Sequence, residues 1–475
     1  MLTRLSADRF SRLLLFLVLA LLVSTPLRVH ALIALLCLYS VAYLVANPRA
    51  RRVGACDMAV LGLLSLYALS QVPHFLLDDF SGRYLSPGLH MVALFPVYLM
   101  LKDALSEAPL CGYRRMLETG IAVGGSAAGV LAVYQTIIMG HYKADGFLFH
   151  INFGYLSASL FLLGVGLLSA SQRRGLLLLG VAGALLATLL SISRGAIFSL
   201  PLVLGLVWLI TAPRWGVQRS LIVMGCLVLV AGASYLFVPL VQERIAYTVQ
   251  EFSSIAAGNI AGSESSGGRV QLWIAAVEAW RASPFIGLTY GERELLNAEL
   301  VQAGMLTEWV NGISRGHAHS QYFEVLATGG LVGVLALFFY LLLPAIFYLV
   351  VYVRRRDNPW ALAGLMFSMG FVLFCLTEVA LQHEMIATYY AYMHITLFLL
   401  LRKSLLSRKA SDAPRGGSGE MPVSERRCCQ LPHARADKEA QLRYDARPSS
   451  VGPGALAQGL LPKPGVQVVG SRRMS

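Results

Sequence analysis

A few polar side chains stand out from a mostly apolar chain, and their types suit the binding of an anion and the transfer of a proton. Arg194 lies between two apolar runs, and Arg269 follows two glycines at the start of a predicted helix. An arginine beside the free N–H groups of a helix start can hold a phosphate with two parallel hydrogen bonds. His319 begins another apolar run, and imidazole is the usual group for moving a proton near neutral pH.

Each of these three residues also has a structural interpretation that the sequence leaves open. Arg194 could be an arginine whose side chain reaches back to the membrane interface. Arg269 could be a solvated surface arginine, and His319 could be a structural histidine. The functional interpretation gains support because all three are predicted on the same side of a membrane.

His317 and His319 form a His-x-His pair, which also suits a metal ion. We predict no metal, because no third histidine or carboxylate lies at a recognised spacing. His383 and Glu384 are the distant ligands that this argument leaves open. Arg315 and His317 are second-rank candidates for the site.

The elements that position these residues are apolar runs. The chain has 475 residues, of which 56% are hydrophobic and 14% charged, and the mean hydropathy is +0.63. A soluble domain carries about 25% charged residues. The runs are continuous over about 17–25 residues, which as helices cross a bilayer. We therefore predict an all-α polytopic membrane protein and exclude a soluble enzyme, a disulfide scaffold, a disordered protein and an alternating β-barrel.

About twelve transmembrane spans follow from the apolar runs. They lie at residues 11–27, 31–47, 57–76, 88–102, 117–139, 150–170, 175–192, 195–211, 220–240, 320–352, 359–378 and 386–401. The first span could instead be a signal peptide, but no small-residue cleavage site follows it and another span begins at once. We expect it to be a retained helix.

The positions of the basic residues indicate the orientation. If the N-terminus is cytoplasmic, only nine of the 39 Lys and Arg residues fall on the opposite side. Cytoplasmic loops carry an excess of Lys and Arg, so both termini are predicted to be cytoplasmic. No cysteine falls in an outer loop, and we expect no disulfide.

One outer loop, residues 241–319 between the ninth and tenth spans, is far longer than the others. Loops of this length are usually functional. Residues 241–257 and 268–281 have the helical spacing of apolar residues. We predict a helical cap on the outer membrane surface, with Trp273 and Trp280 at the level of the lipid headgroups.

The chain therefore divides into a transmembrane core at residues 1–401, which contains the inserted loop, and a C-terminal tail at 402–475. The tail carries 14 Lys and Arg against 6 Asp and Glu, with many Gly, Pro and Ser residues. We predict that it is disordered and attracted to the anionic headgroups of membrane lipids. Binding to nucleic acid is the weaker interpretation, and we expect no nucleic-acid partner.

Two arginines and an imidazole on one face of a membrane suggest a substrate that carries a phosphate or pyrophosphate and approaches from the outer leaflet. A polyprenyl lipid meets both needs. Its apolar tail would lie in the bilayer, and its anionic head would lie at the arginines.

Three segments together resemble the O-antigen ligase and polymerase superfamily. They are SISRGA (191–196), GGRVQLWIAAVEAWRASPFIGL (267–288) and HAHSQYFEVLATGGLVG (317–333). The family pattern has an arginine at an outer helix end, GR…W…P…G in a large periplasmic loop, and an HxHN-like motif before a helix that ends in GxxG. The resemblance covers about residues 10–401, and Ser320 stands where many relatives have Asn.

The resemblance implies a membrane glycosyltransferase of the bacterial inner membrane, closest to O-antigen ligase. Arg194 and Arg269 would bind the pyrophosphate of an undecaprenyl-linked glycan donor. His319 would activate a sugar hydroxyl of the lipid A-core acceptor at the periplasmic face. The reaction would invert the anomeric carbon, and it would need no metal or other cofactor.

Other functions stay open at this point. An O-antigen polymerase would use the same donor with a second lipid-linked glycan as acceptor, and a protein O-oligosaccharyltransferase would glycosylate a protein. A polytopic transporter or lipid flippase is the alternative from a different class, but no internal repeat relates residues 1–211 to 220–401. A structural scaffold would leave Arg194, Arg269 and His319 without a role.

Overall fold

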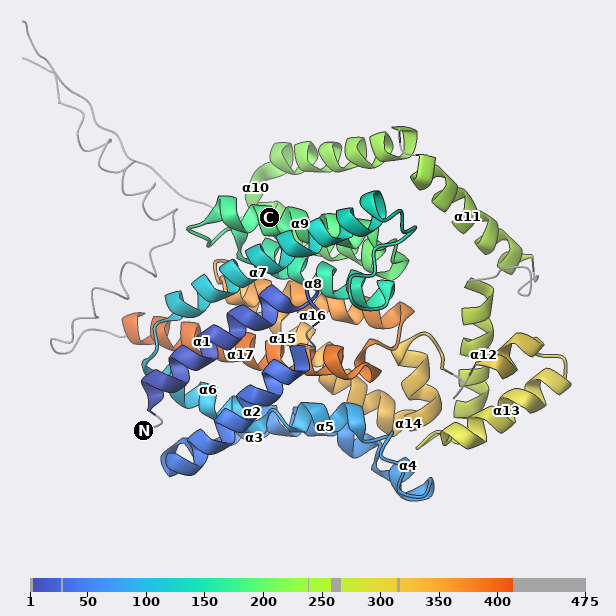
Figure 1. The fold of residues 1–475 in the computed structure, drawn as a ribbon, viewed down its shortest axis with the longest axis horizontal. Coiled ribbons are helices and arrows are strands. Elements are labelled where there is room, and N and C mark those ends of the chain that lie inside the picture. The colour runs from blue at the N-terminus through green and yellow to red at the C-terminus, as the bar shows by residue number, and fades with distance from the viewer. Residues whose placement is uncertain (1–2, 27–28, 238, 258–265, 314–316, 413–475) are drawn as a thin grey trace, which may run out of the picture. The chain divides into compact units, whose positions relative to one another are not determined.

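The computed structural model describes residues 3–26, 29–237, 239–257, 266–313 and 317–412, and the regular elements within these ranges are all helical (Figure 1). Nine of the described helices are long and apolar enough to cross a membrane. The predicted class, an all-α polytopic membrane protein, is confirmed. The number of twelve spans stays a prediction.

The bounds of the helices are as follows. In chain order they are α1 (Arg4–Leu21), α2 (Val29–Ala46), η1 (Pro48–Arg51), α3 (Ala55–Ser70), α4 (Val72–Leu77), α5 (Ser86–Val92), α6 (Phe95–Glu107), α7 (Leu110–Val133), η2 (Tyr134–Ile138), α8 (His150–Leu168), α9 (Arg174–Leu190), α10 (Arg194–Phe237), α11 (Pro239–Ala256), α12 (Ser266–Ala282), α13 (Tyr290–Gln302), η3 (Glu308–Gly312), α14 (Gln321–Leu337), η5 (Phe338–Leu342), α15 (Leu343–Arg354), α16 (Pro359–Thr377), η6 (Ala380–Gln382) and α17 (Glu384–Asp412).

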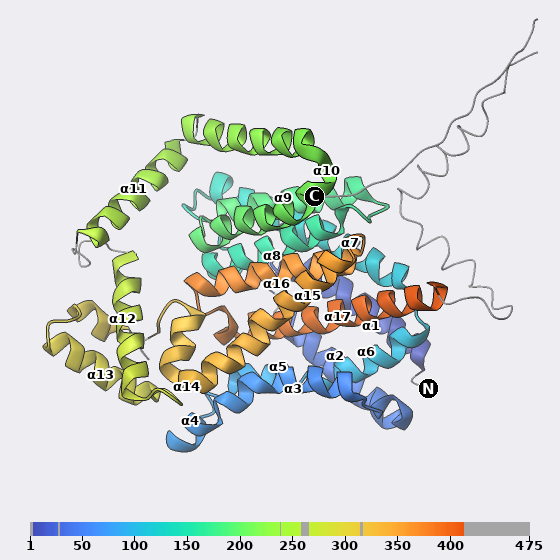
Figure 2. The same ribbon diagram turned by 180° about the vertical axis from the view of Figure 1, so that it is seen from behind.

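Two boundaries differ from the sequence prediction. Residues 212–219, where a turn was expected, belong to α10, which runs from Arg194 to Phe237. The ribbon of α10 nevertheless changes direction sharply along its length (Figure 2), and the part that is apolar and long enough to span a membrane is Arg194–Thr211. The last helix also continues beyond residue 401 to Asp412, so the first part of the predicted tail is helical, and residues 413–475 lie outside the described ranges.

Small residues let several helices approach closely at one end of the bundle. A Cβ on Gly154 of α8 would lie 2.6 Å from the Ser191 Oγ atom. A Cβ on Gly195 of α10 would collide with the Thr377 hydroxyl and the Tyr155 hydroxyl. Such close contacts are typical of helix packing in membranes, and they bring the starts of α8 and α10 next to the end of α16.

The two segments of the long loop that were expected to be helical are the helices α11 and α12, and we call the loop the cap; its place on the outer membrane surface stays a prediction. The cap also contains α13 and η3, which the sequence analysis missed because Tyr290–Gln302 is rich in polar residues. A small apolar core holds α12, α13 and η3 together through Leu272, Leu300 and Val310. Figures 1 and 2 show α12 and α13 beside α14 at one end of the bundle.

The cap is joined to α14 through a break in that helix. Gly330 has φ 53° and ψ −150°, a conformation that essentially only glycine adopts. The break frees backbone groups, and the cap segment supplies their partners through Leu288 N–H to Ala327 O at 2.8 Å, Leu331 N–H to Pro284 O at 2.9 Å and Val332 N–H to Phe285 O at 3.1 Å. We call this contact between residues 284–288 and the α14 break the backbone interlock.

Candidate active site

A polar cavity of about 270 Å³ lies where the starts of α8 and α10 meet the cap. Its lining includes both arginines that the sequence analysis selected, Arg194 and Arg269, although 75 residues of chain separate them. Lys143 and His150 also line it. Among the described residues of the lining none is acidic. We call this space the cation cavity.

Helix starts add to the positive potential of the cation cavity. The lining includes His150 at the first position of α8, Arg194 at the first position of α10, and Arg269 in the first turn of α12. The first N–H groups of a helix have no partner within that helix, and the helix dipole places partial positive charge there. Three helix starts therefore meet at the cavity together with the cationic side chains of Lys143, Arg194 and Arg269. This arrangement suits an anion such as a phosphate.

Arg194 has an internal partner. Its Nη1 atom lies 2.9 Å from an oxygen of Glu251, whose side chain is only 4% exposed. The Glu251 carboxylate also accepts hydrogen bonds from the Ser266 N–H and hydroxyl at the start of α12. Glu251 therefore fixes both the guanidinium and the start of the helix that carries Arg269. The interpretation of Arg194 as an interface arginine does not account for this pairing.

The backbone next to Arg194 is strained. Ile192 lines the cation cavity and has φ +52°, a conformation that is a true outlier for a β-branched residue. His319 also has a positive φ, of +48°. Strain of this kind costs about 1–3 kcal/mol per residue and concentrates at functional sites.

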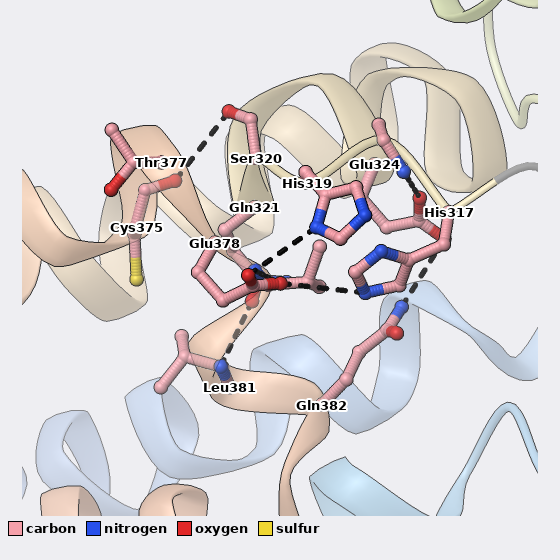
Figure 3. A network of polar contacts seen from close by, with 12 residues as sticks. His317, His319, Ser320, Gln321, Glu324, Cys375, Thr377, Glu378, Leu381 and Gln382 are labelled. Carbon is pink, nitrogen blue, oxygen red and sulfur yellow. Dashed lines mark hydrogen bonds and ion pairs between the residues drawn. The ribbon is translucent and has the colours of Figure 1, made fainter. Parts of the chain in front are cut away.

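His317, His319 and Glu378 form a second cluster at the start of α14 (Figure 3). The His319 Nδ1 atom lies 3.3 Å from Glu378 Oε2, and the His317 Nε2 atom lies 3.8 Å from Glu378 Oε1. The imidazole rings are nearly perpendicular, with centroids 4.7 Å apart. No third ligand lies at a recognised spacing from the His-x-His pair in the sequence, but Glu378 at the end of α16 meets the pair in space.

Burial and the local charges set the protonation states of this cluster. Burial lowers the pKa of His317 below its ordinary value, against the influence of the Glu324 and Glu378 carboxylates. Burial by itself would raise the pKa of Glu378, but the hydrogen bond and charge of His319, with the Val379 N–H and His317, lower that pKa below its ordinary value. At neutral pH His317 is therefore neutral and Glu378 is a carboxylate.

A short chain of contacts connects His317, His319 and Glu378, which we call the histidine cluster, to the cation cavity. Tyr155 lines the cavity, and its hydroxyl forms a 2.8 Å hydrogen bond with Thr377 Oγ1. Thr377 directly precedes Glu378 in the chain. His319 itself is not part of the cavity lining, so the cation cavity and the imidazole are separate and are connected through Tyr155 and Thr377.

Hydrogen bonds to the backbone N–H and carbonyl of Ala318 fix the turn that carries the two histidines. The Ala318 N–H donates to Glu324 at 2.9 Å, and the Ala318 carbonyl accepts from the Trp273 indole at 3.0 Å. Trp273 also stacks on Phe323. Trp273 thus fixes the turn, and its place at the level of the lipid headgroups stays a prediction. Glu324 in turn forms a buried ion pair with Arg293, at 3.0 Å.

The other predicted residues have mixed outcomes. Arg315 lies outside the described residues. Ser320 is buried, and its hydroxyl donates to the Cys375 carbonyl at 3.5 Å. Lys143, His150 and Glu378 were not predicted as site residues. The available signal was position, because each lies within a few residues of a predicted outer end of a span.

Comparison with known proteins supports the resemblance. Residues 176–338 match the family model described as O-Antigen ligase. The match includes Arg194, Arg269 and His319, and it supports the O-antigen ligase superfamily for this chain. Among curated proteins, none matches the chain.

Proposed function

We propose that this protein is an O-antigen ligase that transfers a glycan from undecaprenyl pyrophosphate to a sugar hydroxyl of lipid A-core. The observation that carries the proposal is the cation cavity, because three cationic side chains and three helix starts surround a space that suits a diphosphate. The reaction would take place at the periplasmic face of the bacterial inner membrane. The match to the O-antigen ligase family supports this assignment.

In the proposed reaction the acceptor oxygen attacks the anomeric carbon while the bond from that carbon to the pyrophosphate oxygen breaks. The electron pair of that bond leaves with undecaprenyl pyrophosphate, and the anomeric configuration inverts. Arg194, Arg269 and Lys143 would stabilise the negative charge that grows on the leaving group. Electrostatic stabilisation of this kind usually contributes more to catalysis than any other effect, and losing one donor costs about 10²–10³-fold in rate.

His319 would remove the proton from the acceptor hydroxyl. The Nδ1 atom faces Glu378, so a proton on Nδ1 donates to the carboxylate and leaves Nε2 free to accept. This is the arrangement in which a carboxylate holds the imidazole in its active tautomer. General base catalysis of this type contributes about 10²–10⁴-fold. The chemistry assigned to these residues involves no metal ion.

Two substitutions test the separate roles. We expect His319→Ala to bind the lipid-linked donor normally but to lose transfer by about 10²–10⁴-fold, because binding does not use the base. We expect Arg269→Ala to weaken donor binding as well, because the guanidinium contacts the pyrophosphate. The measurements are donor binding and single-turnover transfer with the purified protein, and Arg281→Ala, a 64% exposed arginine of the same helix, is the control. Transfer by His319→Ala at the wild-type rate contradicts the base assignment.

The lipopolysaccharide of a deletion strain tests the choice of acceptor. A ligase defect leaves lipid A-core without O-antigen while long polymer accumulates on the lipid carrier. Core that bears a single repeat instead indicates a polymerase and overturns the proposal.

A further inference from the structure

We propose that His317, His319 and Glu378 form a binding site for a divalent transition-metal ion of the Zn²⁺ type, and that its occupation inhibits glycan transfer. The metal site rests on the geometry of the histidine cluster alone. The inhibition rests on the proposed function, because it requires His319 to act as the base.

The spacing of the three side chains matches a tetrahedral ion. One ligand atom from each residue can be chosen so that all three lie within 4.8 Å of one another. Zn²⁺ holds nitrogen and oxygen ligands at about 2.0–2.2 Å, which places them about 3.3 Å apart in a tetrahedron. His319 Nδ1 and Glu378 Oε2 are already 3.3 Å apart, and His317 Nε2 is 3.8 Å from Glu378 Oε1. Changes in the distances between ligand atoms of up to about 1.5 Å, from at most 4.8 Å to about 3.3 Å, would close the site.

The ligand types select the ion. Two imidazoles and one carboxylate suit Zn²⁺ and its transition-metal neighbours, whereas Mg²⁺ and Ca²⁺ prefer sets of oxygen atoms. Three protein ligands also leave a fourth position for water. The His317 and His319 side chains are 32% and 34% exposed, so an ion can reach them from the solvent.

Hydrogen bonds from neighbouring groups hold the ligand residues in position before any ion binds. The Val379 N–H donates to Glu378 at 3.1 Å, and both polar groups of Ala318, between the histidines, are bonded. Support of this kind orients metal ligands and raises affinity. The positive charges of the cation cavity oppose a cation, but the charge of the nearer Arg293 is neutralised by its ion pair with Glu324.

Metal binding would block the base through the chemistry of the imidazole ring. A neutral imidazole has one nitrogen that carries hydrogen and one that carries a free electron pair. If the ion takes the electron pair of Nδ1, the ring proton must lie on Nε2. His319 then has no nitrogen left to accept the proton of the acceptor hydroxyl. The same ion would also replace the contact between Nδ1 and Glu378.

The first experiment measures binding without any substrate. Full-length protein without a histidine tag is dialysed against Zn²⁺, and bound metal is counted by mass spectrometry. We expect one specific ion per chain, and we expect His317→Ala, His319→Ala and Glu378→Gln each to weaken binding by more than the about 10–100-fold typical of losing a supporting residue. His90→Ala is the matched control, because His90 has a single carboxylate neighbour, Glu384, at 3.9 Å. Binding that survives all three cluster substitutions overturns the site.

The second experiment measures transfer by the wild-type protein after treatment with a chelator. We expect full activity in the chelator, inhibition when Zn²⁺ is added in excess, recovery when the chelator is restored, and no effect of Mg²⁺. Zn²⁺ that binds at the cluster without inhibiting transfer leaves the site intact and contradicts His319 as the base. Activity that is lost in chelator and restored by Zn²⁺ overturns the inhibitory role.

Discussion

At the scale of single residues, the site depends on a carboxylate that the chain places far from the histidines in sequence. Glu378 follows α16, whereas His317 and His319 precede α14. The carboxylate holds Nδ1 of His319 and stays ionised because His319, the Val379 N–H and His317 together lower its pKa in spite of burial. Its expected role is to orient the imidazole and to stabilise the imidazolium during transfer.

This role predicts a change in the pH dependence of transfer. Because the pKa of Glu378 is lowered, the carboxylate stays ionised through the mildly acidic range, and its contact with His319 should be lost only when the carboxylate is protonated at lower pH. Glu378→Gln removes this contact at every pH, so the maximal rate should fall by about 10²–10⁴-fold. The measurement is kcat against pH.

Glu384→Gln provides the matched control for that profile. Glu384 lies beside His90 and its side chain is 55% exposed, so its loss should leave the rate profile unchanged. A maximal rate in Glu378→Gln that equals the wild-type rate contradicts the orienting role.

At the scale of elements, the backbone interlock attaches the cap to the transmembrane bundle. A Cβ on Gly287 would lie 2.5 Å from the Ala327 carbonyl and 2.7 Å from the Gly329 nitrogen, and Gly287 has φ +77°. Gly330 also has a positive φ, of +53°, and a Cβ there would lie 2.5 Å from the carbonyl carbon of Phe285. The two glycines let the chains of the cap and of α14 pass close enough to exchange hydrogen bonds.

Gly287→Ala should therefore loosen the cap and lower the stability of the protein by at least about 1–3 kcal/mol, because the methyl group meets backbone atoms and the conformation is unfavourable for alanine. Gly291→Ala is the control, since nothing lies within 4 Å of the added methyl group and alanine gains about 0.5–1 kcal/mol within a helix. Thermal unfolding of the purified protein in detergent measures both. Equal melting temperatures for the two variants would show that the interlock contributes little.

The sequence predicted elements better than it predicted their contacts. Apolar runs identified the membrane class and two helices of the cap, because length and periodicity are local properties. Glu378 and Lys143 were missed as site residues because their roles arise only where separate segments meet. The helical backbone at residues 212–219 was missed because the charge of Arg214 and Arg219 was interpreted as a turn, whereas a helix can carry charge without ending.

At the scale of the whole molecule, the proposed function requires one orientation in the membrane. The cation cavity and the histidine cluster both lie at the end of the bundle that carries the cap. An undecaprenyl-linked donor and a lipid A-core acceptor would reach the site together only if this end faces the periplasm. The predicted cytoplasmic position of both termini is consistent with that requirement.

Labelling with a membrane-impermeant maleimide tests the orientation. In a variant whose seven natural cysteines are replaced, Leu295→Cys in α13 should react in intact cells whose outer membrane is permeabilised, because Leu295 is 68% exposed on the cap. A variant that keeps only Cys56, exposed at the start of α3, should react only after the inner membrane is opened. The reverse pattern would place the cap in the cytoplasm and remove the proposed site from its substrates.

The break in α14 also has a consequence for biogenesis. Until residues 284–288 are in place, the ends of the two half-helices carry unsatisfied N–H and C=O groups within a segment that spans the bilayer, which is costly in lipid. The ribosome makes residues 284–288 before α14. If the loop is translocated as predicted, insertion of α14 is coupled to delivery of the loop across the membrane, because residues 284–288 satisfy the backbone groups at the break.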